Sequence, residues 1–278
     1  MKKTFALLLT VVLALSLFGC QSSTPQDDVV VGDDKTIVVS ATLDPHSKVL
    51  EFAKPLLEEK GYTLEIIVID DYYVHNKALS DGDTDANYFQ HVPFFNSEVE
   101  NNGYDIAIVA NIHVEPFGFY SQSITSVDEI PDNAVIIVSN SVSDHGRILA
   151  ILAEAELITL RDGVTTLSAT IDDIIDNPKN FRFKEVQPEL LTVAYEENEG
   201  DLVAINGNYA IQAGLNPIKD AIILEKGGAE NPYVNVITVR KGDENSEKIQ
   251  ALIEVLKSDE VKQFILDTYN DGSVIPAE

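Results

Sequence analysis

The stretch from Thr36 to Ile69, TIVVSATLDPHSKVLEFAKPLLEEKGYTLEIIVI, alternates between two kinds of pattern. Its first six residues form a β-branched apolar run that predicts a strand, and residues 63–69 predict a second strand. Between them, a turn at Asp44-Pro45 leads into residues 46–60, where apolar side chains recur at helical spacing. Gly61 is a typical residue to end that helix. The stretch therefore predicts one strand–helix–strand unit.

The rest of the chain repeats this alternation. Further strands are predicted at 86–88, 105–111, 135–138, 181–185, 202–205 and 234–239. Further helices are predicted at 71–79, 93–101, 144–155, 188–195, 208–213, 246–256 and 258–269. Strands that alternate with helices of this length predict an α/β fold whose parallel sheets carry helices on both faces.

Two segments, His113 to Ser121 and Lys226 to Tyr233, interrupt the alternation because they run extended without a helix. They suit two lobes joined by two extended crossings, in which the last part of the chain returns to the first lobe. We expect lobe 1 to comprise residues 36–117 and 230–278, and lobe 2 to comprise residues 118–229. A ligand in such a fold binds between the lobes, at the carboxyl ends of strands.

The N-terminus reads as a bacterial export signal. Lys2 and Lys3 precede an apolar run, which ends in Leu17-Phe18-Gly19-Cys20. This ending resembles a lipobox, at which the thiol receives a diacylglycerol before cleavage. The alternative is an ordinary signal peptide with an incidental cysteine, but Cys20 is the only cysteine in the chain. We therefore predict a lipoprotein signal peptide over 1–20 and lipidation at Cys20.

Residues 21–35 are rich in Ser, Thr, Pro, Gln and Asp, and they predict a flexible tether between the lipid and the folded body. The chain carries 46 acidic and 19 basic residues, a formal charge of −27. Such an acidic surface repels nucleic acid phosphates and anionic lipid headgroups, so we expect no nucleic acid partner. Attachment to a membrane must then come from the lipid rather than from charge.

Several motifs occur in an order that is more specific than any one of them. They are DANYFQH at 85–91, HVEP at 113–116, Tyr120-Ser121, NPKN at 177–180, NGNYA at 206–210, AGLNP at 213–217 and PYVN at 232–235. In these motifs the chain, from Thr36 to Pro276, resembles the methionine-binding lipoproteins of bacterial ABC importers, the NlpA/MetQ-type family. One segment departs from the family pattern. Asp144-His145-Gly146-Arg147 stands where many relatives have an Asn-Gly-Gly-Arg-like turn, which leaves the finer ligand preference open.

The resemblance implies a periplasmic-binding-protein-like fold of two α/β lobes with a ligand cleft between them. It also implies a substrate-binding lipoprotein that captures L- or D-methionine and delivers it to a cognate permease and ATPase. The expected location is the outer side of the cytoplasmic membrane, with the protein held there by the lipid on Cys20. A methionine-containing dipeptide or another small amino acid is the alternative ligand.

An amino acid site needs a cation for the carboxylate, acceptors for the ammonium group and a pocket for the side chain. Arg147 is expected in the first turn of a helix, where free backbone N–H groups also favour an anion. A guanidinium there can grip a carboxylate with two parallel hydrogen bonds. Taken without the family, Arg147 would more often be an arginine in a surface salt bridge. The resemblance reverses that preference.

Aromatic residues next to a short strand are candidates for the side-chain pocket. Tyr88, Phe89, His91 and His113 could form a slot for an unbranched thioether, although at most three of them are expected to face it. Phe89 or Tyr88 could instead be core packing. A metal site at His91 and His113 is disfavoured because there is no His-x-x-x-His pair and no cysteine to help.

Amide side chains are candidates for the polar groups of the ligand, since they offer both donors and acceptors. Asn206, Asn208 and Asn235 fill this role, but Asn206 follows a strand and is more simply an N-cap of the next helix. Tyr72 is a further candidate, with Tyr120 and Tyr209 as secondary ones.

Neither a nucleophile motif such as Gly-x-Ser-x-Gly nor a glycine-rich phosphate loop occurs in the sequence. We therefore expect a binding protein without catalysis, cofactor or metal. The alternatives from other classes are a cell-envelope hydrolase with paired carboxylates and a surface adhesin. With 46 acidic residues, however, carboxylate pairs are inevitable and indicate little.

Overall fold

A computed structural model of the protein describes residues 35–226 and 231–277. The predicted signal peptide, Cys20 and all of the tether except Lys35 lie outside these ranges. Within them, no helix has the length and apolar character needed to cross a bilayer.

Most predicted elements form, with ends shifted by a few residues. The strands are β1 (Thr36–Ala41), β2 (Thr63–Val68), β3 (Ala86–His91), β4 (Ile106–Val114), β5 (Gly118–Tyr120), β6 (Val135–Ser139), β7 (Thr159–Leu160), β8 (Ile174–Asp176), β9 (Arg182–Val186), β10 (Leu202–Ile205), β11 (Ile223–Leu224), β12 (Asn235–Arg240) and β13 (Ile275–Pro276). The α-helices are α1 (Lys48–Glu59), α2 (Tyr72–Asp81), α3 (Val92–Asn102), α4 (Val142–Glu154), α5 (Leu191–Glu196), α6 (Gly207–Gln212), α7 (Pro217–Asp220), α8 (Glu247–Leu256) and α9 (Asp259–Thr268). Short helical turns are η1 (Leu43–Ser47), η2 (Val127–Glu129), η3 (Ile171–Asp173) and η4 (Pro188–Leu190).

The first sheet has the strand order β13-β4-β12-β3-β1-β2. β1 runs parallel to β2 and β3, whereas β12 is antiparallel to both β3 and β4. The prediction of purely parallel sheets is therefore wrong. β12 follows the second crossing, so it enters the sheet from the opposite direction to the strands that precede the first crossing.

The second sheet has the order β11-β5-β10-β6-β9. β6 is parallel to β9 and β10, and β5 is antiparallel to β10 and β11. Five strands that were not among the predicted ones, β5, β7, β8, β11 and β13, have two or three residues each, and β5 lies in the segment predicted to run extended. Such segments are too short to show a periodicity of their own.

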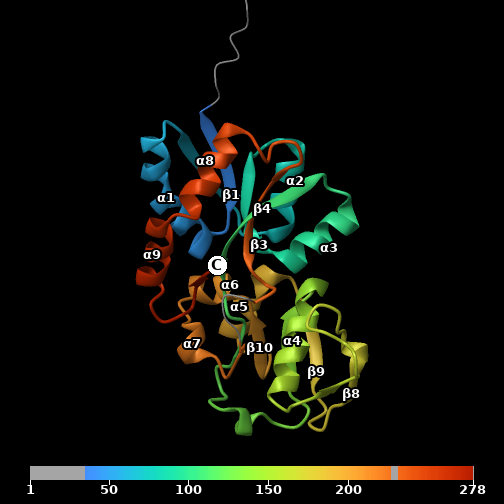
Figure 1. Cartoon of the computed structure of the whole chain (residues 1–278). Coiled ribbons are helices and arrows are strands. Elements are labelled where there is room, and N and C mark those ends of the chain that lie inside the picture. The colour runs from blue at the N-terminus through green and yellow to red at the C-terminus, as the bar shows by residue number, and fades with distance from the viewer. Residues whose placement is uncertain (1–34, 227–230, 278) are drawn as a thin grey trace, which may run out of the picture. The chain divides into compact units, whose positions relative to one another are not determined.

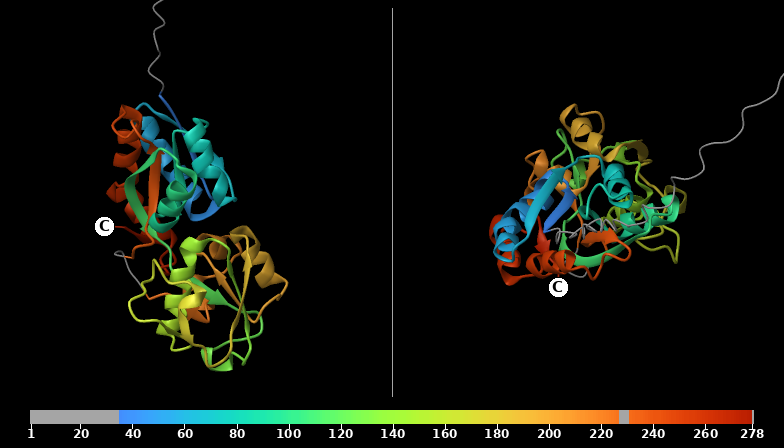
Figure 2. Two further views of the ribbon diagram at one scale, coloured as in Figure 1. Left: turned by 90° about the vertical axis from the view of Figure 1, so that its right-hand side faces the viewer. Right: turned by 90° about the horizontal axis from the view of Figure 1, so that it is seen from above.

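Each sheet has its own hydrophobic core. The first core joins β1, β3 and β12 to α1, α8 and α9, and the second joins β6 and β10 to α4. In the left view of Figure 2 the blue, teal and red elements gather at the upper end and the yellow-green, yellow and gold elements at the lower end. This arrangement supports the predicted lobes, whose limits stay a prediction.

A third core joins side chains from both groups of elements, which Figure 1 shows one above the other. It combines Tyr72 and Phe94, from α2 and α3, with Ile137, Val203 and Tyr209 from the elements of the second sheet. This core lies near the carboxyl ends of β3 and β10. Its residues Tyr72, Phe89 and Phe94 also line the candidate site.

Candidate ligand-binding site

A small cavity of about 20 Å³ lies between the two sheets. Its lining residues come from both groups of elements: Tyr72, Phe89, Gln90, His91, Phe94, Glu115, Arg147, Asn206, Gly207, Asn208 and Asn235. The position at the carboxyl ends of β3 and β10 is the one that the topology predicts.

One wall of the pocket is aromatic. The ring centroids of Tyr72, Phe89 and Phe94 lie 5.8 to 5.9 Å apart from one another. Behind Phe89, the imidazole of His75 stacks on its ring at 4.0 Å, which fixes the position of that ring. A wall of this kind suits an apolar side chain, and a thioether gains further from sulfur–aromatic contact.

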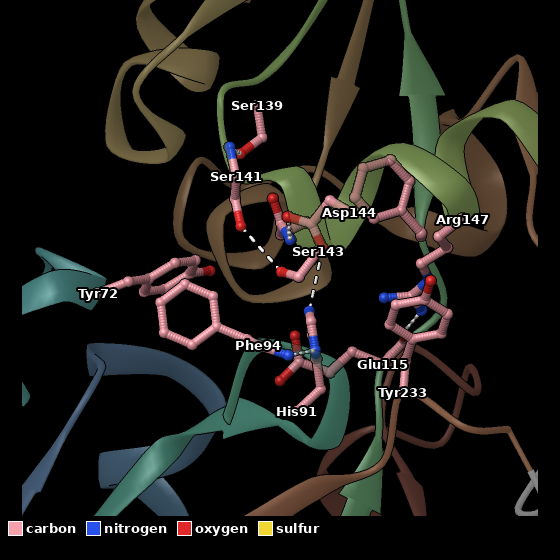
Figure 3. A network of polar contacts seen from close by, with 12 residues as sticks. Tyr72, His91, Phe94, Glu115, Ser139, Ser141, Ser143, Asp144, Arg147 and Tyr233 are labelled. Atoms are coloured by element: carbon pink, nitrogen blue, oxygen red, sulfur yellow. Dashed lines mark hydrogen bonds and ion pairs between the residues drawn. The ribbon is translucent and has the colours of Figure 1, made fainter. Parts of the chain in front are cut away.

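His91 connects the two groups of elements. As the N-cap of α3, its Nδ1 accepts the backbone N–H of Phe94 at 3.1 Å. The ring proton therefore lies on Nε2, which donates to Oδ1 of Asp144 in α4 at 3.0 Å (Figure 3). Both ring nitrogens of His91 are occupied, so only its carbon edge is available to a ligand.

Asp144 is a buried carboxylate with two donors. Besides His91, the side-chain amide of Asn206 donates to its Oδ2 at 3.2 Å. Burial favours the neutral acid, but the hydrogen bond from His91 and the charge of Arg147 outweigh it, so the pKa of Asp144 is lowered. Asp144 is therefore ionised at neutral pH.

Asn206 and Asn208 each present one unpartnered polar atom. Asn206 is 6% exposed and Asn208 is 3% exposed, yet Oδ1 of Asn206 and Nδ2 of Asn208 find no hydrogen-bond partner among the described residues. Oδ1 of Asn208 accepts from the hydroxyl of Tyr72 at 2.5 Å. Buried polar atoms are nearly always paired, so these two are positioned to pair with a ligand or a water molecule.

The prediction that the Asn206 side chain caps the next helix is wrong. Asn206 occupies the N-cap position of α6, but its side chain makes no capping hydrogen bond. The nearby carboxylate of Asp144 takes the amide instead. Because a carboxylate accepts only from the NH₂ group, the side chain is drawn away from the capping geometry.

Arg147 is buried in the second turn of α4, one turn later than expected, because the helix begins at Val142 rather than Asp144. Its Nε and Nη2 donate to the carboxylate of Glu225 at 2.8 and 2.5 Å, and Nη2 also donates to the carbonyl of Glu115 at 2.7 Å. The guanidinium also stacks over the ring of Tyr233, 4.4 Å from its centroid. These three hydrogen bonds use Nε and Nη2 and do not involve Nη1.

Behind the pocket lies a buried network centred on Glu115. Nε2 of His113 donates to Oε1 of Glu115 at 2.8 Å, and Nε2 of His46 lies 3.5 Å from the same oxygen and donates to Oδ1 of Asn235 at 3.0 Å. Burial lowers the pKa of His113 to about 3 and that of His46 to about 4, so both rings are neutral. Burial raises the pKa of Glu115, and attraction from His46 and Arg147 offsets part of that rise.

The pair His91 and His113, weighed as metal ligands from the sequence, is not the group that converges. His46, His113 and Glu115 instead place one possible ligand atom each within 4.8 Å of one another. All three atoms already take part in the hydrogen bonds of this network. The geometry therefore fits a hydrogen-bonded network of two neutral imidazoles and a carboxyl group, and it carries no argument for a metal.

Two candidates from the sequence do not line the pocket. Tyr88 and His113 are fully buried and hydrogen-bond each other, with Tyr88 donating to Nδ1 of His113. Since adjacent strand residues point to opposite faces, Phe89 faces the pocket while Tyr88 faces the core of the first sheet. The secondary candidates Tyr120 and Tyr209 also pack in a core.

The other candidates from the sequence all line the pocket: Tyr72, Phe89, His91, Arg147, Asn206, Asn208 and Asn235. Their part in binding stays a prediction. The sequence reasoning missed Gln90, Phe94, Glu115 and Gly207, of which Gln90, Glu115 and Gly207 lie inside motifs that it had singled out. Their position in those motifs was the signal that could have identified them.

Comparison with known proteins gives consistent matches. The model of the NlpA lipoprotein family matches residues 37–278. The chain is 50% identical to the methionine-binding lipoprotein MetQ of Bacillus subtilis over 277 residues, which cover 99% of each chain. A solved nutrient binding protein from Burkholderia cenocepacia, bound to methionine, is 34% identical with a TM-score of 0.81, over 87% of this chain and all of that one. A periplasmic substrate-binding protein of an ABC transporter from Coxiella burnetii is 36% identical with a TM-score of 0.80, over 87% and 100% of the chains.

Proposed function

Because the chain belongs to the NlpA lipoprotein family, we propose that it is the substrate-binding lipoprotein of an ABC importer and that its ligand is methionine. The relatives support both parts, since one is named for methionine binding, one is solved with methionine and one is an ABC transporter component.

The observation that carries the proposal is the pair of unpartnered atoms in the pocket. Oδ1 of Asn206 can only accept a hydrogen bond, and Nδ2 of Asn208 can only donate one. An amino acid zwitterion supplies both complements, with an ammonium group that donates and a carboxylate that accepts. A purely apolar ligand would leave both atoms buried and unpaired, and a ligand with only a carboxylate or only an ammonium group would leave one of them unpaired.

We place the ligand as follows. The carboxylate accepts from Nδ2 of Asn208 and from Nη1 of Arg147. The ammonium group donates to Oδ1 of Asn206, to the second lone pair on Oδ1 of Asn235 and to Glu115, whose negative charge offsets that of the ammonium. The thioether chain lies against Tyr72, Phe89 and Phe94.

The protein binds rather than catalyses in this proposal, as its substrate-binding relatives do. A cell-envelope hydrolase would need a nucleophile or a water between two carboxylates. The carboxylates at this site instead accept from neighbouring side chains, Asp144 from His91 and Asn206, and Oε1 of Glu115 from His113.

We further propose that a lipid on Cys20 holds the protein on the outer side of the cytoplasmic membrane, next to the permease and ATPase that receive its ligand. The family name supports the lipid, and two or more acyl chains give a stable hold on the bilayer. Cys20 itself lies outside the described residues.

The test begins with protein that is unfolded to release any retained ligand and then refolded. Mass spectrometry of the released fraction should detect methionine, and calorimetric titration should give tight binding of methionine but not of methioninol, which lacks the carboxylate. Titration with L- and D-methionine and a methionine dipeptide identifies the preferred form. Binding of methioninol as tight as that of methionine would refute the proposed site.

A further inference from the structure

The acceptor that Asn206 presents to the pocket depends on Asp144. Asp144 is 1% exposed, and its two oxygens are taken by different partners: Oδ1 by His91 and Oδ2 by Nδ2 of Asn206. Figure 3 shows the side chain of Asp144 on α4, the helix that also carries Arg147, with its hydrogen bond to the ring of His91.

An ionised carboxylate accepts hydrogen bonds and donates none. Asn206 must therefore turn its NH₂ group toward Asp144, and its carbonyl oxygen then points the other way. That oxygen is the one without a partner among the described residues, in a side chain that lines the pocket. The opposite orientation would place two acceptors against each other beside Asp144.

The arrangement is preset within one group of elements. Asp144 follows β6 and Asn206 follows β10, and these two strands are parallel neighbours in the second sheet. Both residues thus leave the same edge of one sheet, so their contact needs no residue of the first sheet. Such an acceptor is preorganised within the second sheet, and preorganisation lowers the cost of ordering a site on binding.

We propose that Asp144 is a positioning residue that selects ligands with a protonated α-amino group. It acts through Asn206, by fixing the amide so that the pocket offers an acceptor at the place of the α-substituent. This inference rests on the proposed function, because it assumes an amino acid ligand whose ammonium group lies beside Asn206.

The test compares L-methionine with 4-(methylthio)butanoate, which has the same carboxylate and thioether but no amine. The wild-type protein should prefer methionine. In Asp144→Asn, the new NH₂ group can donate to Oδ1 of Asn206, so the Asn206 amide can turn and present a donor that repels the ammonium group. The preference for methionine should fall by about tenfold to a hundredfold, the range expected for a hydrogen bond to a charged group.

Two controls separate this role from a structural one. Asp162→Asn removes the same charge from an exposed position and should leave the preference unchanged. Asn206→Leu should lose the preference to a similar extent, and adding Asp144→Asn to Asn206→Leu should then have no further effect on it. Such non-additivity is expected only if Asp144 acts through Asn206.

The outcomes are distinct. If wild type does not bind methionine, the proposed function fails. If wild type prefers methionine but Asp144→Asn weakens both ligands by the same factor, Asp144 only holds the closed form together and this inference is overturned. If Asp144→Asn does not fold, Asn206→Leu decides instead, because an unchanged preference in that variant also overturns it.

Discussion

Arg147 and Glu225 form a buried bidentate ion pair, in which Nε and Nη2 of the guanidinium donate to the two carboxylate oxygens at 2.8 and 2.5 Å. The residues are 78 positions apart, and their side chains are 5% and 10% exposed. The pair orients the guanidinium and leaves Nη1 as the nitrogen that can meet a ligand. Arg147 therefore has a structural role and a proposed binding role, and these can be separated.

We expect Arg147→Ala to lower both stability and methionine affinity. The substitution leaves Glu225 buried and unpaired, which typically costs about 3–5 kcal/mol of stability. The double variant Arg147→Ala/Glu225→Ala should recover most of that loss, because no unpaired charge remains. Its methionine affinity should stay low, by about 2–5 kcal/mol relative to wild type, since the proposed partner of the ligand carboxylate is still absent. Urea unfolding and calorimetric titration measure the two effects. Recovery of affinity in the double variant would place the carboxylate elsewhere.

Asn208→Ala should weaken methionine binding by about 1.5–3 kcal/mol, the value of a hydrogen bond to a charged group. Tyr72→Phe should have a smaller effect, because it removes only the hydroxyl that holds Oδ1 of Asn208. Calorimetric titration of both variants is the measurement. A larger loss in Tyr72→Phe than in Asn208→Ala would contradict the proposed role of the amide.

Methionine affinity should decrease as the pH falls. Burial raises the pKa of Glu115, with His46, Arg147 and His91 as the nearby positive or titratable groups that oppose the rise. A bound ammonium group favours the ionised form, so binding is strongest above the pKa of Glu115 and is lost as the carboxylate takes up a proton. Titrations from about pH 8 to about pH 5 should show a loss of up to about tenfold per pH unit below that pKa. Glu115→Gln should bind more weakly at neutral pH and show little of this dependence.

The free energy of unfolding should also fall in acid because of neutral buried histidines. Burial lowers the pKa of His46 to about 4, and those of His75 and His113 to about 3, from 6.5. The folded state therefore binds fewer protons than the unfolded state below pH 6.5. Each neutral histidine contributes its full stabilisation of the folded state above that pH. Its contribution to the free energy of unfolding falls by about 1.4 kcal/mol per pH unit as the pH decreases toward its folded pKa.

Urea unfolding at several pH values measures this slope, and His75→Gln tests its origin. His75 hydrogen-bonds Ser40 and the carbonyl of Ile69 and does not line the pocket, so the variant should lose about a third of the slope. Protonation of the many carboxylates relieves their mutual repulsion and so raises the free energy of unfolding as the pH falls. This effect is the same in wild type and in His75→Gln, so it cancels when the two slopes are compared. An unchanged slope in His75→Gln would exclude this residue as a source.

Cys20→Ser should abolish attachment to the membrane. The acidic body gives no electrostatic attraction to anionic lipids, so the acyl chains are the expected means of attachment. Full-length protein made in a bacterium should partition into detergent, and the variant should stay in the aqueous phase or keep its signal peptide. Equal partitioning of the two proteins would refute the anchor.

The sequence by itself determined most of the helices and strands. A β-branched run ends where β1 ends, at Ala41, and the prediction for β10 coincides with the observed strand. Local patterns are sufficient for such elements because the backbone conformation and the apolar spacing depend on residues within one or two turns. The ordered motifs also identified the family and most of the residues that line the pocket.

Only the tertiary structure decided how those residues are used. Tyr88 and Phe89 are adjacent, and the register of β3 decided which ring faces the pocket. The side chain of Asn206 hydrogen-bonds Asp144, 62 residues away, instead of capping its own helix. Arg147 pairs with Glu225, 78 residues away. These contacts depend on how the sheets bring distant segments together, and no local spacing records which of 46 carboxylates will lie beside a given donor.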